Sequence, residues 1–255
     1  MAATRAAIAL DEVGGVAFDM DGVVTDTAPV HAAAWKEALD PFLRDYARSA
    51  GERIPPFDVH GDYLRYLDGR TRAEGARAFL ASRGMASAEG TDRQAPDAAA
   101  VALVCERKDA AFLDRVRRFG VAGFASTVAL VGELRRAGAA TALVSASRNC
   151  AAVMEAAGLA DLFGVRVDGG DAARLHLPGK PDPALFVEAA RRMRVPVART
   201  AVVEDAVAGV EAGARGGFAL VIGVDRTGQE RELYRHGAHV VVSDLSQVTV
   251  VGRSA

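Results

Sequence analysis

Apolar and polar residues follow each other along this chain with two different spacings. Short, nearly continuous apolar runs that stop at a polar residue or a glycine predict buried strands at residues 15–19, 140–147, 164–169, 200–205, 218–224 and 238–244. Apolar residues spaced three and four apart predict helices at residues 127–138, 149–158, 182–195 and 206–217. Strands that alternate with helices in this way form βαβ units, so we expect a parallel sheet with helices on both faces.

The region between the first two strands has a different pattern. Residues 31–47, 71–84 and 109–120 show helical spacing with charged faces, and the polar, Gly- and Pro-containing stretch 86–96 is expected to be a loop. We therefore predict an α/β fold with a doubly wound, Rossmann-like core of residues 1–27 and 120–255. A helical domain, residues 28–119, is inserted after its first strand.

The charge, the cysteine content and the length of the apolar runs argue against several classes of protein. The 31 basic and 33 acidic residues give a net charge of −2, which argues against a nucleic-acid-binding protein. Two cysteines without CxxC spacing indicate a reducing compartment. No apolar run approaches the roughly 18 residues of a membrane span, and no secretion signal is recognisable, so we expect a cytoplasmic protein that binds no membrane.

Lysine is scarce in this chain. Only three of the 31 basic residues are lysines, Lys36, Lys108 and Lys180. A chain that otherwise uses arginine poses the question of why these three positions differ.

Polar side chains gather where the predicted strands end. Asp19 and Asp21 follow the first strand, Ser145 ends the second, and Glu204 and Asp205 end the strand at 200–205. Lys180 lies in a loop that opens a helix. Ligands bind outside the carboxyl ends of the strands in such sheets, and carboxylate oxygens suit Mg²⁺. Each of these residues alone would be an ordinary helix cap or turn residue, whereas all of them in this order indicate one shared site.

Four segments carry a family resemblance. FDMDGVVTDT, VSASRN, KPDP and VVEDAVAGVEAG resemble, in order, the four signature motifs of the haloacid-dehalogenase superfamily of phosphotransferases. The inserted helical region looks like the cap domain of that superfamily. More narrowly, the chain is similar to the β-phosphoglucomutase subfamily, whose members convert β-glucose 1-phosphate to glucose 6-phosphate.

The resemblance implies roles for the core residues. Asp19 would be the nucleophile that carries the phosphoryl group, and Asp21 would be the general acid and base. Ser145 would bind a phosphoryl oxygen and Lys180 would neutralise charge. Mg²⁺ would be held by Asp19, the backbone carbonyl of Asp21, Glu204 and Asp205. The chemistry agrees, because phosphoryl transfer needs mainly positioning and charge stabilisation.

The resemblance also implies a substrate-binding set. A mutase must bind a sugar bisphosphate in two orientations, which requires a second phosphate site. The residues at matching positions are Thr27, His31, Trp35, Gly69, Arg72, Lys108, Ser147, Arg148 and Asn149. Thr27, His31 and Trp35 are spaced by four and are expected on one helical face, with Arg72 as the ligand of the distal phosphate. The plainer alternatives are that Trp35 is a core residue, that His31 is a surface residue and that an Arg-rich loop is ordinary in this chain.

Two departures from the subfamily leave the sugar open. Asp68 stands where these mutases usually carry lysine, and Asp109 stands where asparagine is common. A phosphatase acting on trehalose phosphate or a hexose phosphate is the alternative to a mutase, and a sugar-phosphate sensor is disfavoured because no core motif residue is lost. We expect a monomer whose partner is a small phosphosugar, with a sugar bisphosphate as activator.

Overall fold

The computed structural model describes residues 6–68, 70–85 and 97–252, and it divides into two compact units. Unit 1 is Met1–Thr27 with Val121–Ala255, and unit 2 is Ala28–Gly120. The predicted loop at residues 86–96 lies outside the described residues.

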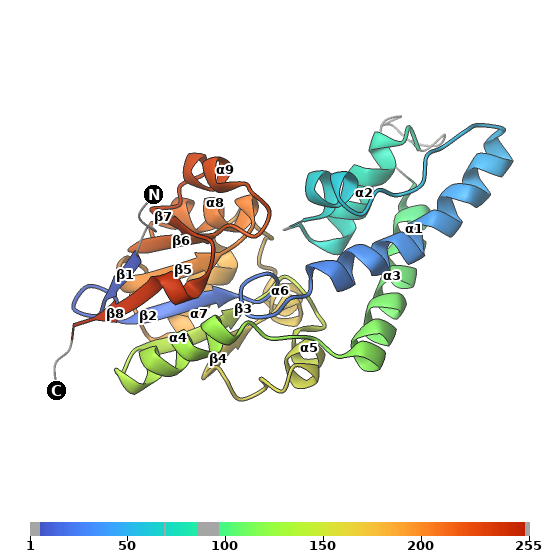
Figure 1. Ribbon diagram of the computed structural model, residues 1–255. Helices are drawn as coiled ribbons and strands as arrows, with labels where there is room; N and C mark the ends of the chain where they lie inside the picture. Colours follow the sequence, from blue (N-terminus) through green and yellow to red (C-terminus); the bar gives the residue numbers. More distant parts are fainter. Residues whose placement is uncertain (1–5, 69, 86–96, 253–255) are drawn as a thin grey trace. The chain divides into compact units, whose positions relative to one another are not determined.

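Unit 1 is built on a parallel sheet of six strands in the order β4-β3-β2-β5-β6-β7 (Figure 1). Its strands are β2 (Gly15–Asp19), β3 (Ala140–Val144), β4 (Val165–Val167), β5 (Thr200–Glu204), β6 (Leu220–Val224) and β7 (Val240–Val242). The chain adds β3 and β4 on one side of β2 and then crosses to add β5, β6 and β7 on the other. The order therefore reverses at β2, and ligands of such sheets bind at the carboxyl end of that strand. The predicted α/β fold class with a parallel sheet is confirmed.

In the residues that the structure describes, unit 1 also contains six α-helices. They are α4 (Ala125–Arg136), α5 (Cys150–Ala156), α6 (Gly169–Leu175), α7 (Ala184–Met193), α8 (Val207–Arg215) and α9 (Glu230–Arg235). The sequence predicts α4, α5, α7 and α8, but it predicts no helix where α6 lies. Asp168 supplies the missing start signal, because its side chain accepts hydrogen bonds from the backbone N–H groups of Gly170 and Asp171.

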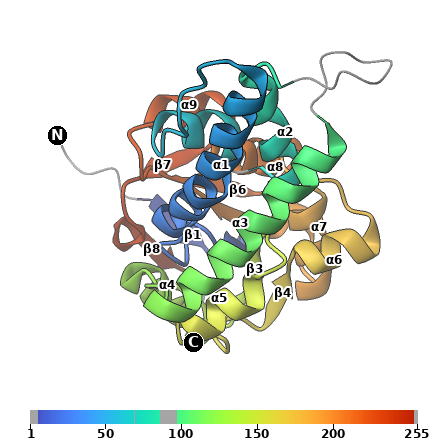
Figure 2. The ribbon, with the colours of Figure 1, turned by 90° about the vertical axis from the view of Figure 1, so that its right-hand side faces the viewer.

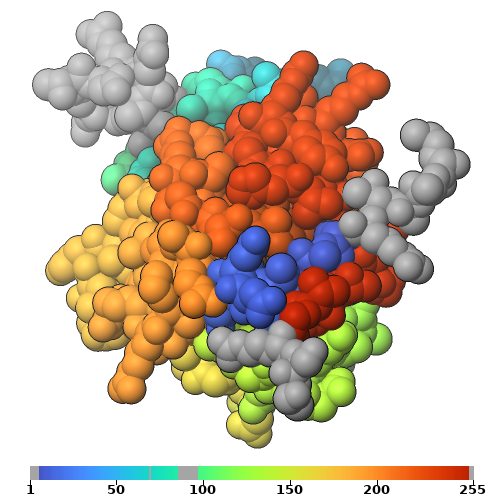
Figure 3. Space-filling view, turned by 90° about the vertical axis from the view of Figure 1, so that its left-hand side faces the viewer, coloured from blue at the N-terminus to red at the C-terminus, as the bar shows by residue number. Residues whose placement is uncertain are grey.

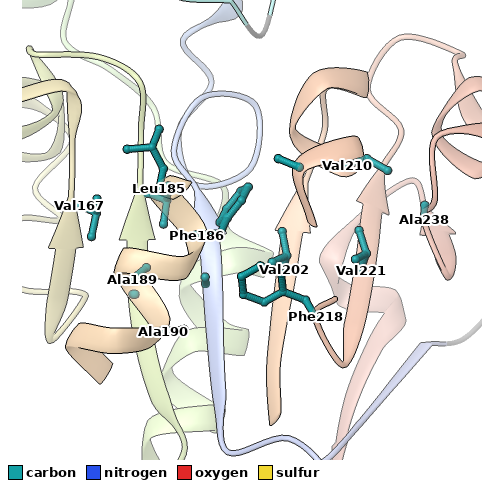
Figure 4. Packing of buried hydrophobic residues seen from close by; sticks show 14 of the residues in the cluster. Val167, Leu185, Phe186, Ala189, Ala190, Val202, Val210, Phe218, Val221 and Ala238 are labelled. Carbon is teal, nitrogen blue, oxygen red and sulfur yellow. The ribbon is translucent and has the colours of Figure 1, made fainter. Parts of the chain in front are cut away.

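One hydrophobic cluster joins α7 and α8 to the sheet. Phe186 of α7 and Val210 of α8 lie in the same buried cluster as Ala17 of β2 and Val202 of β5 (Figure 4). All five residues of β2 are buried, which requires cover on both faces and explains why its sequence is a continuous apolar run rather than an alternating one.

A small second sheet was not predicted from the sequence. Strand β1 (Ala6–Ala9) pairs in parallel with β8 (Val248–Val251), and the two ends of the described chain lie side by side (Figure 3). The backbone N–H of Leu10 donates to the Val251 carbonyl at 2.8 Å. This ribbon joins segments from opposite ends of the sequence.

Unit 2 is helical in its described residues. It contains α1 (Ala28–Ala50), a π-helical turn (Tyr63–Leu67), α2 (Arg72–Ser82) and α3 (Ala98–Phe119). Helices α1 and α3 lie side by side, and with α2 they enclose a core that includes Trp35, Leu39 and Phe79 (Figures 1 and 2). Thr27 precedes α1, whose first turn holds Pro29, so Thr27 is not on the helical face that the spacing predicts. None of the described helices is both long enough and apolar enough to cross a bilayer.

Candidate active site

Three neighbouring strands end in polar residues at one edge of the sheet. Asp19 and Glu204 are the last residues of β2 and β5, and Ser145 directly follows β3. The register pairs Phe18 with Val203 and Asp19 with Val144. Asp19, Glu204 and Ser145 therefore lie at the same level, where their neighbouring strands end. All three residues are buried. The structure therefore brings together the strand-end residues that the sequence singles out.

Lys180 connects two of these strand ends. It lies in the loop between α6 and α7, and its Nζ donates to Oδ1 of Asp19 and to Oε1 of Glu204. The lysine side chain is only 4% exposed, and its Nζ is 4.9 Å from the centre of the Phe186 ring. A single ammonium is thus enclosed between two carboxylates and an aromatic face.

Burial and neighbouring charges shift the pKa values of Asp19 and Lys180. Burial raises the pKa of the Asp19 carboxyl well above its ordinary value; Lys180 opposes this shift, while Glu204 and Asp21 add to it. Burial by itself would lower the pKa of Lys180, but Asp19 and Glu204 outweigh it and raise that pKa. The lysine therefore stays charged, and Asp19 lies in a site rich in negative charge.

Two glycines make room for the carboxylates of β5 and the residue after it. A Cβ on Gly22 would overlap the Asp205 carboxylate, and Gly22 has a φ of +77°, which favours glycine. A Cβ on Gly209, in α8, would overlap the Glu204 carboxylate. The second Glu204 oxygen, Oε2, accepts from the backbone N–H of Ala206 at 2.6 Å. Both glycines belong to the motifs quoted above, but the sequence does not show that each one leaves space for a carboxylate.

Thr27 contacts Asp21 rather than standing on a helix face. Its hydroxyl donates to Oδ1 of Asp21, and Thr27 is fully buried. The turn that carries Asp21 is closed by hydrogen bonds from Gly22 N–H to the Thr25 carbonyl and from Thr25 N–H to the Met20 carbonyl. Asp21 is thus held by its own turn and by the buried hydroxyl of Thr27, six residues further along the chain.

The segment after β3 forms a tight turn. Oγ of Ser145 accepts from the backbone N–H of Ser147 at 3.1 Å, and Oγ of Ser147 accepts from the N–H of Asn149 at 3.1 Å. Asn149 directly precedes α5, and Arg148 is exposed. The side-chain oxygens of both serines therefore face the backbone of this turn.

No preassembled metal cluster is found in the described part of the chain, where no three His, Cys, Asp or Glu side chains are grouped as metal ligands. Between Asp19 and Glu204 the structure instead places the Lys180 ammonium. The oxygen donors named from the sequence all lie at the same strand-end edge or in the segments directly after it.

In unit 2, buried Lys108 pairs with the partly buried His31. Nζ of Lys108 is 2.8 Å from Nδ1 of His31, and the lysine residue is 4% exposed. The His31 ring stacks on Phe112 with centres 4.3 Å apart, and Lys108 Nζ lies 4.4 Å from the same ring. Trp35 is buried in the core of this unit, and the centre of its ring lies 5.7 Å from Lys108 Nζ. The plainer alternative for Trp35, a core residue, agrees with this position.

Arg72 has a carboxylate partner within its own unit. Its Nη2 lies 2.6 Å from Oδ1 of Asp109, and the two side chains are 26% and 33% exposed. Arg72 is the first residue of α2, whose start is capped by Thr71 and Glu74. Gly69, the loop residue named with Arg72, lies outside the described residues.

One residue near the site was missed in the sequence. Nε of Arg226, in the loop after β6, donates to the Gly22 carbonyl at 2.9 Å. Nothing in its local sequence distinguishes Arg226 from the many other arginines of the chain, so only the fold could identify it.

Comparison with known proteins gives one consistent result. Residues 13–217 match the haloacid dehalogenase-like hydrolase family. A protein of Mycobacterium bovis named "Beta-phosphoglucomutase" is 39% identical over 241 residues, which cover 93% of this chain and 92% of that protein. A "Trehalose-phosphate phosphatase" of Mycobacterium leprae is 40% identical, but over only 49% of this chain and 28% of that protein.

Solved structures agree in fold. A β-phosphoglucomutase from Clostridium difficile superimposes with a TM-score of 0.68 at 23% identity and covers 92% of both chains. A putative β-phosphoglucomutase from Bacteroides vulgatus gives a TM-score of 0.70 at 19% identity over 92% of this chain and 86% of that one.

Proposed function

The chain belongs to the haloacid dehalogenase-like hydrolase family, and on that premise we propose that it is a Mg²⁺-dependent phosphotransferase that acts on sugar phosphates through a covalent intermediate on Asp19. The observation that carries the proposal is the buried Asp19 carboxylate at the end of β2, held by Lys180. The substrate that we propose is β-glucose 1-phosphate, converted to glucose 6-phosphate, because a relative named for this activity matches almost the whole chain.

Asp19 is the proposed nucleophile. One of its carboxylate oxygens attacks the phosphorus, the bond from phosphorus to the leaving oxygen breaks, and the phosphoryl group becomes an acyl phosphate on Asp19. Division of the transfer into two displacements is the ordinary advantage of covalent catalysis. In the second step the free hydroxyl of a sugar monophosphate attacks the phosphorus and the bond to Asp19 breaks. The sugar bisphosphate formed in this way binds again in the other orientation, which completes a mutase cycle.

Asp21 is the proposed general acid and base. It gives a proton to the leaving oxygen in the first step and takes one from the attacking hydroxyl in the second. The buried Thr27 hydroxyl that donates to Oδ1 of Asp21 fixes the orientation of this carboxyl.

Lys180 would neutralise negative charge during the transfer, and Ser145 would position the phosphoryl group. The Lys180 ammonium neutralises Asp19 before attack and the transferred oxygens afterwards, which is the charge stabilisation that phosphoryl transfer requires. Ser145, buried at the end of β3, would bind a phosphoryl oxygen.

The donor set at the strand ends fits Mg²⁺. The Asp19 and Asp205 carboxylates and the Asp21 backbone carbonyl offer the hard oxygens that this ion prefers, and Gly22 leaves space for Asp205 beside that carbonyl. Glu204 is the fourth proposed ligand, although its two oxygens already accept from Lys180 and from the Ala206 N–H. The ion would supply positive charge to a site in which two carboxylates share one lysine.

Metal binding can be measured without substrate. Titration calorimetry with Mg²⁺ is expected to show one site, and Asp205→Asn should weaken its affinity about tenfold or more. Glu188→Gln, remote in sequence from these ligands, is the control and should leave the affinity unchanged. An Asp205→Asn variant that binds Mg²⁺ as tightly as the parent would contradict the ligand assignment.

The second phosphate and the sugar would be bound by the residues that the resemblance names. Arg72 is the proposed ligand of the distal phosphate through its guanidinium fork, and Lys108 and His31 are proposed to contact the sugar. Ser147, Arg148 and Asn149 complete this set on the turn after β3. Trp35 and Gly69 stay proposals from the resemblance, with Trp35 acting through the packing of Lys108.

Mutase and phosphatase differ in what leaves the enzyme. Purified protein with Mg²⁺, β-glucose 1-phosphate and a trace of β-glucose 1,6-bisphosphate should form glucose 6-phosphate without matching release of phosphate. Glucose 6-phosphate is followed by a coupled dehydrogenase and phosphate by a colorimetric assay, with Asp19→Asn as the inactive control. Stoichiometric phosphate release in place of glucose 6-phosphate would refute the mutase.

A phosphatase is the second candidate function. The partial match to trehalose-phosphate phosphatases favours it, since the residues proposed for phosphoryl transfer would serve equally if water attacked the acyl phosphate. Release of phosphate from trehalose 6-phosphate in the same assay would support this alternative.

The remaining assignments are also proposals. Residues 1–27 and 120–255 would form the phosphotransferase core and residues 28–119 its cap, in a monomer that works in the cytoplasm. Sedimentation velocity with and without a sugar bisphosphate tests the monomer.

A further inference from the structure

Arg226 contacts three segments that are far apart in the sequence. Its Nε donates to the Gly22 carbonyl at 2.9 Å, and its Nη1 donates to the Ser243 carbonyl at 3.4 Å. The guanidinium carbon lies 3.9 Å from the centre of the Phe124 ring. One side chain therefore joins the turn after β2, the segment before α4 and the segment after β7.

The contact with Gly22 falls within the proposed catalytic turn. Gly22 follows Asp21, and its N–H donates to the Thr25 carbonyl at 2.8 Å. The Asp205 carboxylate lies against the α-carbon of Gly22. Any rotation of the Gly22 peptide would therefore move the backbone that carries Asp21 and close the space that Asp205 uses.

The contact with Phe124 falls on a pair of linkers. The segment that leaves β2 and the segment that returns before α4 run together in unit 1: Phe124 N–H donates to the Val24 carbonyl and Asp26 N–H to the Ala122 carbonyl, both at 2.9 Å. Thr25 also bridges to Gly123. Arg226 thus holds one linker through a carbonyl and the other through an aromatic ring.

The environment of Arg226 differs from that of an ordinary surface ion pair. Its nearest carboxylate, Asp244, is 3.7 Å away and accepts a hydrogen bond from Ser126 at 2.9 Å. Nη2 is buried and has no hydrogen-bond partner among the residues that the structure describes. Such a donor is costly, so the position is poorly explained by stability alone. The contacts of Arg226 with the Gly22 carbonyl and the Phe124 ring offer another explanation for its position.

We propose that Arg226 is a positioning residue that fixes the Asp21–Gly22 turn and the two paired linkers. Its effect on turnover rests on the proposed function, whereas its effect on the turn does not. Loss of the guanidinium would let the turn move, and misplacement of a catalytic group by about 1 Å costs on the order of 100-fold in rate.

The test compares Arg226→Gln and Arg226→Lys with Arg231→Gln, which changes an exposed arginine on α9. Hydrogen exchange, followed by mass spectrometry on peptides covering residues 20–27 and 121–127, reports the turn and linkers directly. We expect Arg226→Gln to speed exchange there about tenfold. We also expect kcat for the phosphosugar to fall about 10- to 100-fold with KM within about twofold. Arg226→Lys should restore part of kcat, and Arg231→Gln should change neither.

A role limited to stability would have a different signature. It would lower Tm while leaving kcat of the folded enzyme and local exchange unchanged, and that result would overturn the proposal. Phe124→Leu provides a second variant if Arg226→Gln does not fold, and it should speed exchange mainly in residues 121–127. If exchange rises as expected but the parent protein turns over no phosphosugar, the proposed function fails and the positioning of the turn stands.

Discussion

At the scale of single residues, the three lysines lie in different surroundings. Lys180 is enclosed between Asp19, Glu204 and the Phe186 ring, whereas Lys36 is 45% exposed and pairs with Asp40 at 2.9 Å. A planar guanidinium is wider than an ammonium and does not fill the same space. Lysine is therefore required at position 180 by shape, and the scarcity of lysine in the sequence is informative there.

This difference predicts unequal effects of the same substitution. Lys180→Arg should lower kcat at least about 100-fold although the charge is kept, because the larger group displaces Asp19. Lys36→Arg should leave kcat within about twofold. Steady-state kinetics of both variants checks this, and equal activity of the two would remove the argument from size.

Asp19→Asn separates chemistry from folding. The variant lacks the nucleophilic carboxylate and should lose activity by a factor of about 1,000 or more. Its Tm should not fall, since an amide replaces a buried carboxylate whose pKa is raised by burial and by Glu204 and Asp21. A kinetic assay and a thermal melt give the two numbers. Loss of activity together with a large loss of Tm would mean that Asp19 is needed for the fold.

Asp109 gives a prediction about substrate affinity. Its carboxylate lies 2.6 Å from Arg72, so a phosphate that binds this arginine competes with Asp109. Asp109→Asn removes the competing charge and should lower KM for the phosphosugar about 3- to 10-fold with little change in kcat. The inhibition constant of inorganic phosphate should fall by a similar factor, and an unchanged value in the variant would argue against Arg72 as a phosphate ligand.

The sequence predicts the residues of the core cluster better than their contacts. Asp19, Ser145 and Glu204 were found because strand ends in a parallel sheet share one edge. Thr27 was placed on the wrong surface, since the spacing of four treats it as helical while the helix begins one residue later. Arg226 carries no local signal, because its partners are a carbonyl and a ring brought in by other segments.

At the scale of elements, α7 is tied to its neighbours by charge. Glu188 accepts from Arg191 and Arg192, and Arg192 also reaches Asp171 of α6 and the Arg166 carbonyl of β4. Hydrogen bonds from Arg191, opposed by burial and helped by Arg192, lower the pKa of Glu188 to about 2. The helix, the strand and α6 are thus joined by one ionised carboxylate network.

The network should make stability depend on pH in a defined range. Because the folded state lowers the pKa of Glu188 from 4.5 to about 2, its contribution is complete above about pH 4.5 and is lost as pH falls toward 2. Glu188→Gln should lower the free energy of unfolding by about 1–2 kcal/mol at pH 7, after allowance for the exposed Arg191. Urea denaturation at pH 7 and pH 3 measures this, with Glu211→Gln, in the less buried pair with Arg215, as control. An equal loss at both pH values would exclude the ionised form as the cause.

The predicted elements succeed where the signal is local. Continuous apolar runs and helical spacing identify the strands and long helices of unit 1. A strand that is buried on both faces needs apolar residues at successive positions, and a helix that is buried along one side needs them three and four residues apart. Strands β1 and β8 fail this test, since each is short and becomes a strand only by pairing with the other end of the chain.

At the scale of the whole molecule, the β1–β8 ribbon closes unit 1. A chain that ends at Gln247 would lose β8, the bond from Leu10 N–H to Val251 and the burial of Val248. We expect Tm to fall by about 5 °C. Thr249→Ala, which removes only the 3.2 Å bond from Thr249 to the Ala6 carbonyl, should cost far less. Equal melting of the truncated and full chains would show that the ribbon adds nothing to stability.

The paired linkers have a consequence for how this protein can change over time. The chain leaves the sheet unit at Thr25–Asp26 and re-enters it at Ala122–Gly123, and these points are bonded to each other. Because the two ends of the inserted unit are adjacent, unit 1 does not have to deform to accommodate it, and the insertion can be exchanged without disturbing the core. Recombination or rapid drift within Ala28–Gly120 can then replace the residues proposed to contact the sugar while the residues proposed for phosphoryl transfer are inherited unchanged.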